Sequence, residues 1–143
     1  MKIMDKELLL VDLCARLPYG VKVCSPDKTI CSIWSVPTIS VVTVINGSGQ
    51  SSHPIKDIKP YLRPLSSMTK EEKESLRQEH LKDERLFADC IKKSQSGNNS
   101  LRGKVITHYA ADWCNAHHFD FRNLIEKGLA LEALEGMYNL NND

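Results

Sequence analysis

The densest group of side chains that could bind a metal, or act as nucleophile and base, lies near the end of the chain. Cys114, His117 and His118 fall within five residues. Positions three and four apart share one face of a helix, so a thiolate and an imidazole could converge on one zinc ion. A structural zinc site takes four ligands, however, and no second cysteine or histidine pair stands at the usual spacing. We therefore expect no metal site and no cofactor; one histidine should bond carbonyls at a helix end and the other should be solvated.

Catalysis by a cysteine finds little support in the sequence. Cys114 with His118 could form a nucleophile and base, but no local pattern marks a residue to orient the base or an oxyanion site. Residues 97–104 depart from a phosphate loop in spacing, and no hydroxyl residue follows the lysine. We expect a protein that is not an enzyme. A metal- or thiol-dependent enzyme around Cys114, His117 and His118 is the least favoured alternative.

A second group of chemically useful side chains is basic and lies between residues 18 and 64. This segment holds five basic and two acidic side chains, a net charge of +3, whereas residues 65–143 carry a net charge of −2. Cations interleaved with aromatic rings are typical of grooves that bind peptides or nucleic acid. In the competing interpretation, Trp34 and Leu62 pack in a core and the lysines only solvate its rim. The candidate binding residues are Lys22, Lys28, Lys56, Lys59, Tyr61 and Arg63.

The elements that must position these residues change in character at Pro64. Short β-branched runs and turn residues precede it, and almost everything after it has helical character. We expect an α+β fold with an N-terminal helix over 1–17, a β-barrel over 18–64 and a helical region over 65–143. Asp5 should cap the first helix, which ends near Arg16 and faces the core with Leu9, Leu13 and Leu17.

The barrel prediction rests on four to five short antiparallel strands. Val21 to Cys24, Thr29 to Trp34 and Ile39 to Ile45 should be strands, with Pro37 interrupting the ladder and Asn46-Gly47 forming a hairpin turn. Residues 48–52 should be loop, 56–58 one helical turn and 59–63 a closing strand. Closure into a small SH3-like barrel would hide the edges of the Val/Ile-rich third strand.

The helical region begins with a capped helix. Thr69 and Glu72 match a capping box, which predicts a helix over 69–95 with a strongly charged surface. Residues 94–100 lack the apolar groups that would offset the entropy of ordering, so we expect a mobile loop there.

A helical hairpin should follow over 105–128. The sequence predicts one helix to about His117 and a second over 121–127, capped by Asp120 and ended by Gly128. The second helix carries too few basic residues to hold a nucleic-acid backbone, so we expect ordinary packing rather than a DNA-reading motif.

Cysteine usage and hydropathy indicate a compartment. Five cysteines without a Cys-x-x-Cys pair are typical of reduced thiols rather than of a disulfide framework. The apolar run over residues 8–11 is too short for a secretory signal or a membrane span. We expect a cytoplasmic protein with no membrane partner.

Two segments resemble a known group of proteins. Residues 57–69 (DIKPYLRPLSSMT) and 113–122 (WCNAHHFDFR) resemble segments of small phage- and prophage-encoded proteins of gut anaerobic bacteria, a family without an assigned activity. The resemblance implies an accessory or assembly protein in the host-cell cytoplasm and assigns no residue a role.

These observations favour a non-enzymatic phage or prophage accessory protein that acts as a protein-interaction module. Its partner would be a phage or host protein, and the charged helix over 69–95 could also join copies of the chain into a homo-oligomer. The alternative is a nucleic-acid-binding accessory factor that uses the basic barrel face.

Overall fold

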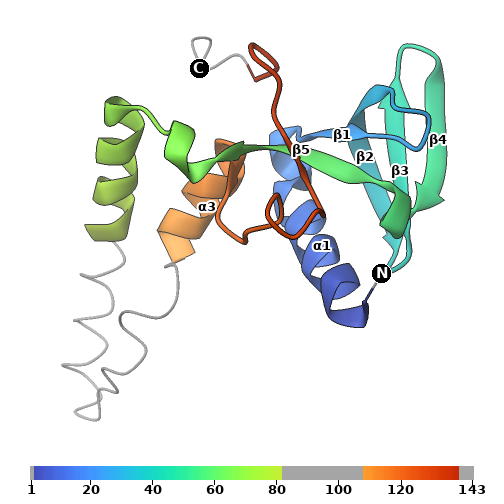
Figure 1. Ribbon diagram of the computed structural model, residues 1–143, viewed down its shortest axis with the longest axis horizontal. Coiled ribbons are helices and arrows are strands. Elements are labelled where there is room, and N and C mark those ends of the chain that lie inside the picture. Colours follow the sequence, from blue (N-terminus) through green and yellow to red (C-terminus); the bar gives the residue numbers. More distant parts are fainter. Residues whose placement is uncertain (1, 82–107, 139–143) are drawn as a thin grey trace.

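The computed structural model describes residues 2–81 and 108–138, and it shows an α+β fold built on one mostly antiparallel sheet (Figure 1). The strand order is β4-β3-β2-β1-β5-β6, and β7 also pairs with β5. In chain order the helices and strands are α1 (Ile3–Arg16), β1 (Lys22–Cys24), β2 (Ile30–Thr38), β3 (Val41–Asn46), β4 (Gly49–Pro54), β5 (Lys59–Pro64), a helix over 70–81, α3 (His108–Ala116), β6 (Phe119–Asp120) and β7 (Leu131–Glu132). Single 3-10 turns lie at Leu17–Tyr19, Ile55–Asp57 and Leu65–Ser67.

The predicted N-terminal helix is confirmed, but its predicted cap is wrong. Leu9 and Leu13 are fully buried, and Leu17 packs against the same core. The helix begins before Asp5, which lies in its first turn, and no side chain caps it. A carboxylate in the first turn still interacts favourably with the positive end of the helix dipole. The helix ends where Pro18 enters a 3-10 turn and Gly20 adopts a left-handed conformation with φ of 69°.

The Asn46-Gly47 hairpin is confirmed, and it is longer than predicted. Six successive residue pairs join β3 to β4, from Asn46 opposite Gly49 to Val41 opposite Pro54. The polar residues 49–52, expected to be loop, are therefore strand, because pairing with β3 satisfies their backbone groups. The predicted interruption of the ladder at Pro37 is confirmed, because the pairing of β2 with β3 shifts in register between Ser35 and Thr38. The predicted end of the strand at Trp34 is wrong, since β2 continues to Thr38.

The strand β5 links the sheet to the helical parts of the molecule. Its first residues pair antiparallel with β1, and its later residues pair in parallel with β6 and β7. Figure 1 shows β5 crossing the molecule from the sheet toward the helix over 70–81. Among the described strands the sheet is open, and its end strands β4 and β6 are not paired with each other.

One hydrophobic core unites residues that are far apart in the sequence. Leu9 and Leu13 of α1 pack with Val23, Ile33, Val42, Val44 and Leu62 of the sheet, and with Leu124, Leu129 and Ala130 near the other end of the chain. A second, smaller cluster of Met68, Cys114 and Phe119 lies beside it, with Leu76, Trp113 and Phe121 packed against it. Apolar burial thus holds the N-terminal helix, the sheet and the residues before β7 together.

A buried charge cluster, formed by Asp12, Arg16 and Arg122, fastens α1 to the C-terminal residues. Arg16 is fully buried and donates from Nε to both oxygens of Asp12 at 2.9 and 3.0 Å, and from Nη2 to the Phe119 carbonyl at 2.6 Å. Arg122 donates from Nη1 to Asp12 Oδ1 at 2.5 Å. One buried carboxylate therefore accepts hydrogen bonds from two guanidinium groups, those of buried Arg16 and partly buried Arg122.

The predicted capping box is confirmed. Glu72 N–H donates to the Thr69 hydroxyl at 3.2 Å, and Thr69 N–H donates to the Glu72 carboxylate at 3.0 Å. The helix that follows is described over 70–81. Its predicted continuation to 95, the predicted mobile loop over 94–100 and residues 105–107 of the predicted hairpin lie outside the described residues.

The predicted second helix of the hairpin is wrong. After α3 the chain forms β6, and residues 121–130 form turns rather than an α-helix. Without a helix Asp120 caps none, but its carboxylate holds the turns by accepting the N–H groups of Leu124 and Ile125 at 2.9 and 3.0 Å. Gly128 ends the turns with φ of 76°. Strand β6 ends at Asp120, directly before the predicted helix, and the segment after it places Leu124, Leu129 and Ala130 in the main core.

Candidate functional site

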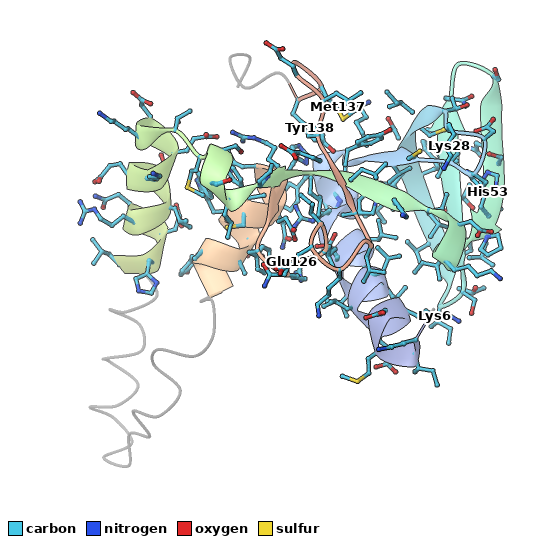
Figure 2. All side chains as sticks on the ribbon, viewed as in Figure 1. Lys6, Lys28, His53, Glu126, Met137 and Tyr138 are labelled. Carbon is cyan, nitrogen blue, oxygen red and sulfur yellow. The ribbon has the colours of Figure 1, made fainter. Side chains whose placement is uncertain are left out.

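A lysine pocket, defined by Lys28, Lys56, Lys59 and Tyr61, opens at one end of the sheet. Its volume is about 480 Å³, and Cys24, Ser25, Pro26, Asp57 and Leu131 complete its lining. Figure 2 shows Lys28 at the end of the sheet away from Lys6. Four of the six residues predicted to bind a partner thus line one pocket. The three lysines come from the β1–β2 turn, the 3-10 turn Ile55–Asp57 and the start of β5.

Hydrogen bonds among the residues of the β1–β2 turn fix its shape and thereby hold Lys28 at the pocket. Lys28 N–H donates to the Ser25 carbonyl at 2.9 Å, and the Ser25 hydroxyl donates to the Asp27 carboxylate. Thr29 N–H donates to the same carboxylate at 3.2 Å. The hydrogen bond from Ser25, followed by those from Thr29, lowers the pKa of Asp27. Lys28 itself has φ of 68°, a left-handed conformation that a tight turn requires.

The pocket is cationic. Three lysines and one acidic residue, Asp57, line it, and within the described parts of the chain none of the three lysines belongs to a salt bridge. Burial raises the pKa of Tyr61, and the adjacent Cys24 adds to this shift, so the phenol stays protonated as a hydrogen-bond donor. Ammonium groups and a phenol O–H together suit a carboxylate or a phosphate.

The remaining side chains of the pocket show what surrounds the lysines. No histidine is among its described lining residues, and its one thiol, Cys24, points its Sγ to the Ser25 carbonyl at 3.5 Å. The arrangement can bind and orient an anionic group.

Two predicted binding residues lie elsewhere. Lys22 donates from Nζ to the Ser32 hydroxyl at 2.8 Å on the neighbouring strand. Arg63 is buried: its Nη1 and Nη2 each donate to Glu72 at 2.8 Å, and its guanidinium lies 4.0 Å from the centre of the Phe119 ring. The prediction that Arg63 belongs to a binding surface is therefore wrong, because this residue joins β5 to the helix over 70–81.

The ion pair between Arg63 and Glu72 also changes the pKa of Glu72. Burial opposes the negative charge of Glu72, but the hydrogen bonds from Arg63 and from Thr69 outweigh it, so the pKa of this carboxyl lies below its ordinary value. The sequence pointed to Glu72 as a capping residue, and its second partner could not be read from a spacing of nine residues.

The structure separates the three candidate metal ligands. Cys114 is fully buried in the smaller core cluster, and burial raises the pKa of its thiol to about 11. His117 stacks on Trp113 at 4.0 Å between ring centres, and its Nδ1 donates to the Trp113 carbonyl at 2.9 Å. This contact confirms that one histidine bonds a carbonyl at the helix end. Among the described residues, no three His, Cys, Asp or Glu side chains are grouped as metal ligands.

His118 was expected to be solvated, and that prediction is wrong. It has a left-handed backbone with φ of 65°, and its ring stacks on Tyr138 at 3.8 Å between ring centres. Burial, followed by the nearby charges of Arg16 and Arg63, lowers the pKa of His118 to about 4. The Tyr138 hydroxyl donates to the Tyr61 carbonyl at 2.6 Å and accepts the Lys22 N–H at 2.9 Å. This pair of rings therefore closes the C-terminal residues over β1 and β5.

Sequence reasoning missed several residues of the pocket. Pro26 and Ser25 were assigned only a turn, and Leu131 enters because β7 pairs with Tyr61 from seventy residues away. The alternation of β5 was a usable signal, since Lys59 and Tyr61 are two apart and must share one face of a strand.

The chain matches no protein-family model, no curated protein and no solved structure. The phage-related resemblance of residues 57–69 and 113–122 therefore stays a prediction. Among the described residues, no helix has the length and apolar character needed to cross a bilayer.

Proposed function

We propose that the protein is a non-enzymatic interaction module that binds an acidic segment of a partner protein in the lysine pocket. One observation carries the proposal: Lys28, Lys56 and Lys59 converge on one open pocket from three separate elements, without a salt bridge to any described carboxylate. Unpaired lysines gathered in a concave site attract anions more strongly than the same lysines spread over a surface.

The sheet supports an SH3-like arrangement for this module. Five antiparallel strands in the order β4-β3-β2-β1-β5, with a 3-10 turn directly before β5, correspond to the strand order of small SH3-like barrels. Such small folds hold their binding residues in the loops between strands. The phage-related resemblance supports the same class, an accessory protein that acts through a partner.

Nucleic acid is the less favoured ligand. The alternative relied on a basic face that included Arg63, which is instead buried against Glu72. Three pocket lysines and Lys22 remain, fewer than the phosphate contacts that give strong backbone binding.

Titration with a fluorescein-labelled hexaglutamate peptide, followed by fluorescence anisotropy at about 50 mM salt, tests the proposal. We expect saturable binding that weakens at least about tenfold when Lys56 and Lys59 are both changed to Gln. In the matched control Lys70 and Lys73, which are exposed on the helix over 70–81, are both changed to Gln. Equal binding by both double variants, or no saturable binding by the wild-type protein, would reject the pocket as the site.

A further inference from the structure

The face of β1, β2 and β5 that lies away from α1, here the outer face, continues from the lysine pocket. Along β2 the side chains alternate: Cys31 and Ile33 are buried in the core, whereas Ile30 and Trp34 are 44% and 55% exposed. Since α1 covers the core side, Ile30 and Trp34 belong to the outer face. A large aromatic side chain left this exposed on a regular strand is a candidate contact for a partner.

A β-bulge sets the position of Trp34. Ile33 lies opposite Val44 and Ser35 lies opposite Thr43, so Trp34 is an extra residue on β2 without its own partner on β3. Beyond the bulge, Val36 returns to the core side and packs against it. The bulge therefore lets the core pattern continue on both sides of Trp34 while this side chain stays on the outer face. Bulges commonly re-aim one side chain in this way at functional positions.

The strand register places the outer face next to the pocket. Cys24, which lines the pocket, lies opposite Ile30 on β2 and opposite Lys59 on β5. Two strand spacings, about 10 Å, thus separate Lys59 from Ile30. Trp34 lies four residues further along β2, about 13 Å from Ile30. A peptide of about five extended residues could reach from the pocket to Trp34.

We propose that the partner segment is an extended peptide with an acidic side chain in the lysine pocket and an apolar side chain on Ile30 and Trp34. This inference rests on the proposed function of the pocket and extends it to a second contact. Charge complementarity favours an acidic side chain in the pocket, because its lining holds three lysines without a salt bridge and only one carboxylate, that of Asp57, among the described residues. The outer face favours an apolar side chain at the other end of the peptide, because Trp34 and Ile30 together form an exposed hydrophobic surface.

The composition of the outer face favours a peptide over single-stranded nucleic acid. Stacking of successive bases needs a series of exposed aromatic platforms, and on the outer face Trp34 is 55% exposed whereas Tyr61 of β5 is buried. Ile30 offers no ring for a base, but it suits an aliphatic side chain. A peptide uses both residues, whereas nucleic acid would use one.

Three labelled peptides test the inference by chemical-shift mapping on the ¹⁵N-labelled full chain. The first joins an acidic stretch of four glutamates to a leucine-phenylalanine stretch by a short Gly/Ser linker, and the other two are its separate halves. We expect the joined peptide to bind at least about tenfold more tightly than the acidic half, because the second contact becomes intramolecular. The indole N–H signal of Trp34 should move with the joined peptide, and that of Trp113 should not.

Trp34→Ala should remove the advantage of the joined peptide and leave binding of the acidic half unchanged. Ile39→Ala is the matched control, since Ile39 is 72% exposed in the turn between β2 and β3. If the joined peptide binds no better than its acidic half, the inference fails and the lysine pocket stands. If the acidic half does not bind, the proposed function fails with it. Tighter binding of oligo-dT than of the joined peptide, lost in Trp34→Ala, would overturn the inference in favour of nucleic acid.

Discussion

The lysine pocket and the buried charge cluster use the same kinds of side chain for opposite purposes. In the pocket, three lysines face solvent without a carboxylate partner among the described residues. In the cluster, Asp12 and Arg16 are fully removed from solvent and the interior holds their charges in a fixed geometry. The position of a cation in the fold, more than its presence in the sequence, therefore decides whether it serves stability or binding.

The largest expected effect comes from removing the shared carboxylate of the cluster. Asp12→Asn leaves the buried Arg16 and the partly buried Arg122 without a counter-charge, so we expect a loss of about 3–5 kcal/mol in the free energy of unfolding. Urea denaturation followed by circular dichroism measures it. Glu7→Gln removes an exposed charge from the same helix and should change stability by less than about 0.5 kcal/mol. Similar losses in both variants would show that the cluster does not stabilise the fold.

The next effect depends on pH and belongs to His118. Its pKa is lowered to about 4 in the folded protein, by burial first and then by nearby Arg16, Arg63, His117 and Lys22, against about 6.5 in an unfolded chain. The unfolded state therefore takes up the proton first, and stability should fall as pH decreases from about 7 to about 4. We expect this histidine to contribute about 1–2 kcal/mol to that fall after allowance for solvent screening.

His118→Asn tests this contribution, because asparagine tolerates the left-handed backbone and does not titrate. Thermal unfolding between pH 7 and pH 4 should show a shallower pH dependence in the variant than in the wild type. Parallel curves would mean that His118 becomes protonated without cost and that Tyr138 does not shield it.

A smaller effect is expected at the Arg63 and Glu72 pair, which is less buried than the cluster. Glu72→Gln keeps the shape of the side chain but loses its charge, so we expect a loss of about 1 kcal/mol at neutral pH. The folded pKa of Glu72 is depressed, so its contribution is present above the unfolded pKa of about 4.3 and disappears as pH falls through the folded value. Wild type and variant should therefore converge in stability below about pH 4. Exposed Glu71→Gln is the control on the same helix.

The smallest effect on stability is expected in the lysine pocket. Lys56→Gln combined with Lys59→Gln should change the free energy of unfolding by less than about 0.5 kcal/mol, because neither lysine belongs to a salt bridge in the described chain. The same variant should lose binding of the acidic peptide. A large loss of stability instead would make these lysines structural and remove the contrast with the buried cluster.

Local signals predicted the elements that depend on neighbouring residues. The leucine spacing of α1, the Asn46-Gly47 turn and the Thr69 capping box are each satisfied within a few residues, and all three are confirmed. The α+β class follows from the same signals. Strand β4 was missed because its polar residues 49–52 gain their structure from pairing with β3, which composition does not reveal.

The site was predictable only in part, for a related reason. Alternation along β5 and the turn after β1 place Lys28, Lys59 and Tyr61 at the same end of the sheet. The burial of Arg63, by contrast, depends on its contacts with Glu72, Phe119 and the His117 carbonyl. Core packing of Trp34 was one of two interpretations, and the structure exposes this side chain instead. With Ile33 in the core, ordinary alternation turns Trp34 outward, and the bulge that returns Val36 to the core leaves no mark in the sequence. Contacts across long separations decide these cases.

The single core described above has a consequence for synthesis on the ribosome. Leu9 and Leu13 emerge first, yet Leu124, Leu129 and Ala130, which complete their surroundings, emerge more than a hundred residues later. Contacts of such long sequence separation form late and slowly. The N-terminal helix can pack against the sheet once residues up to Leu62 have been made, but the core around it stays incomplete until Leu124, Leu129 and Ala130 follow.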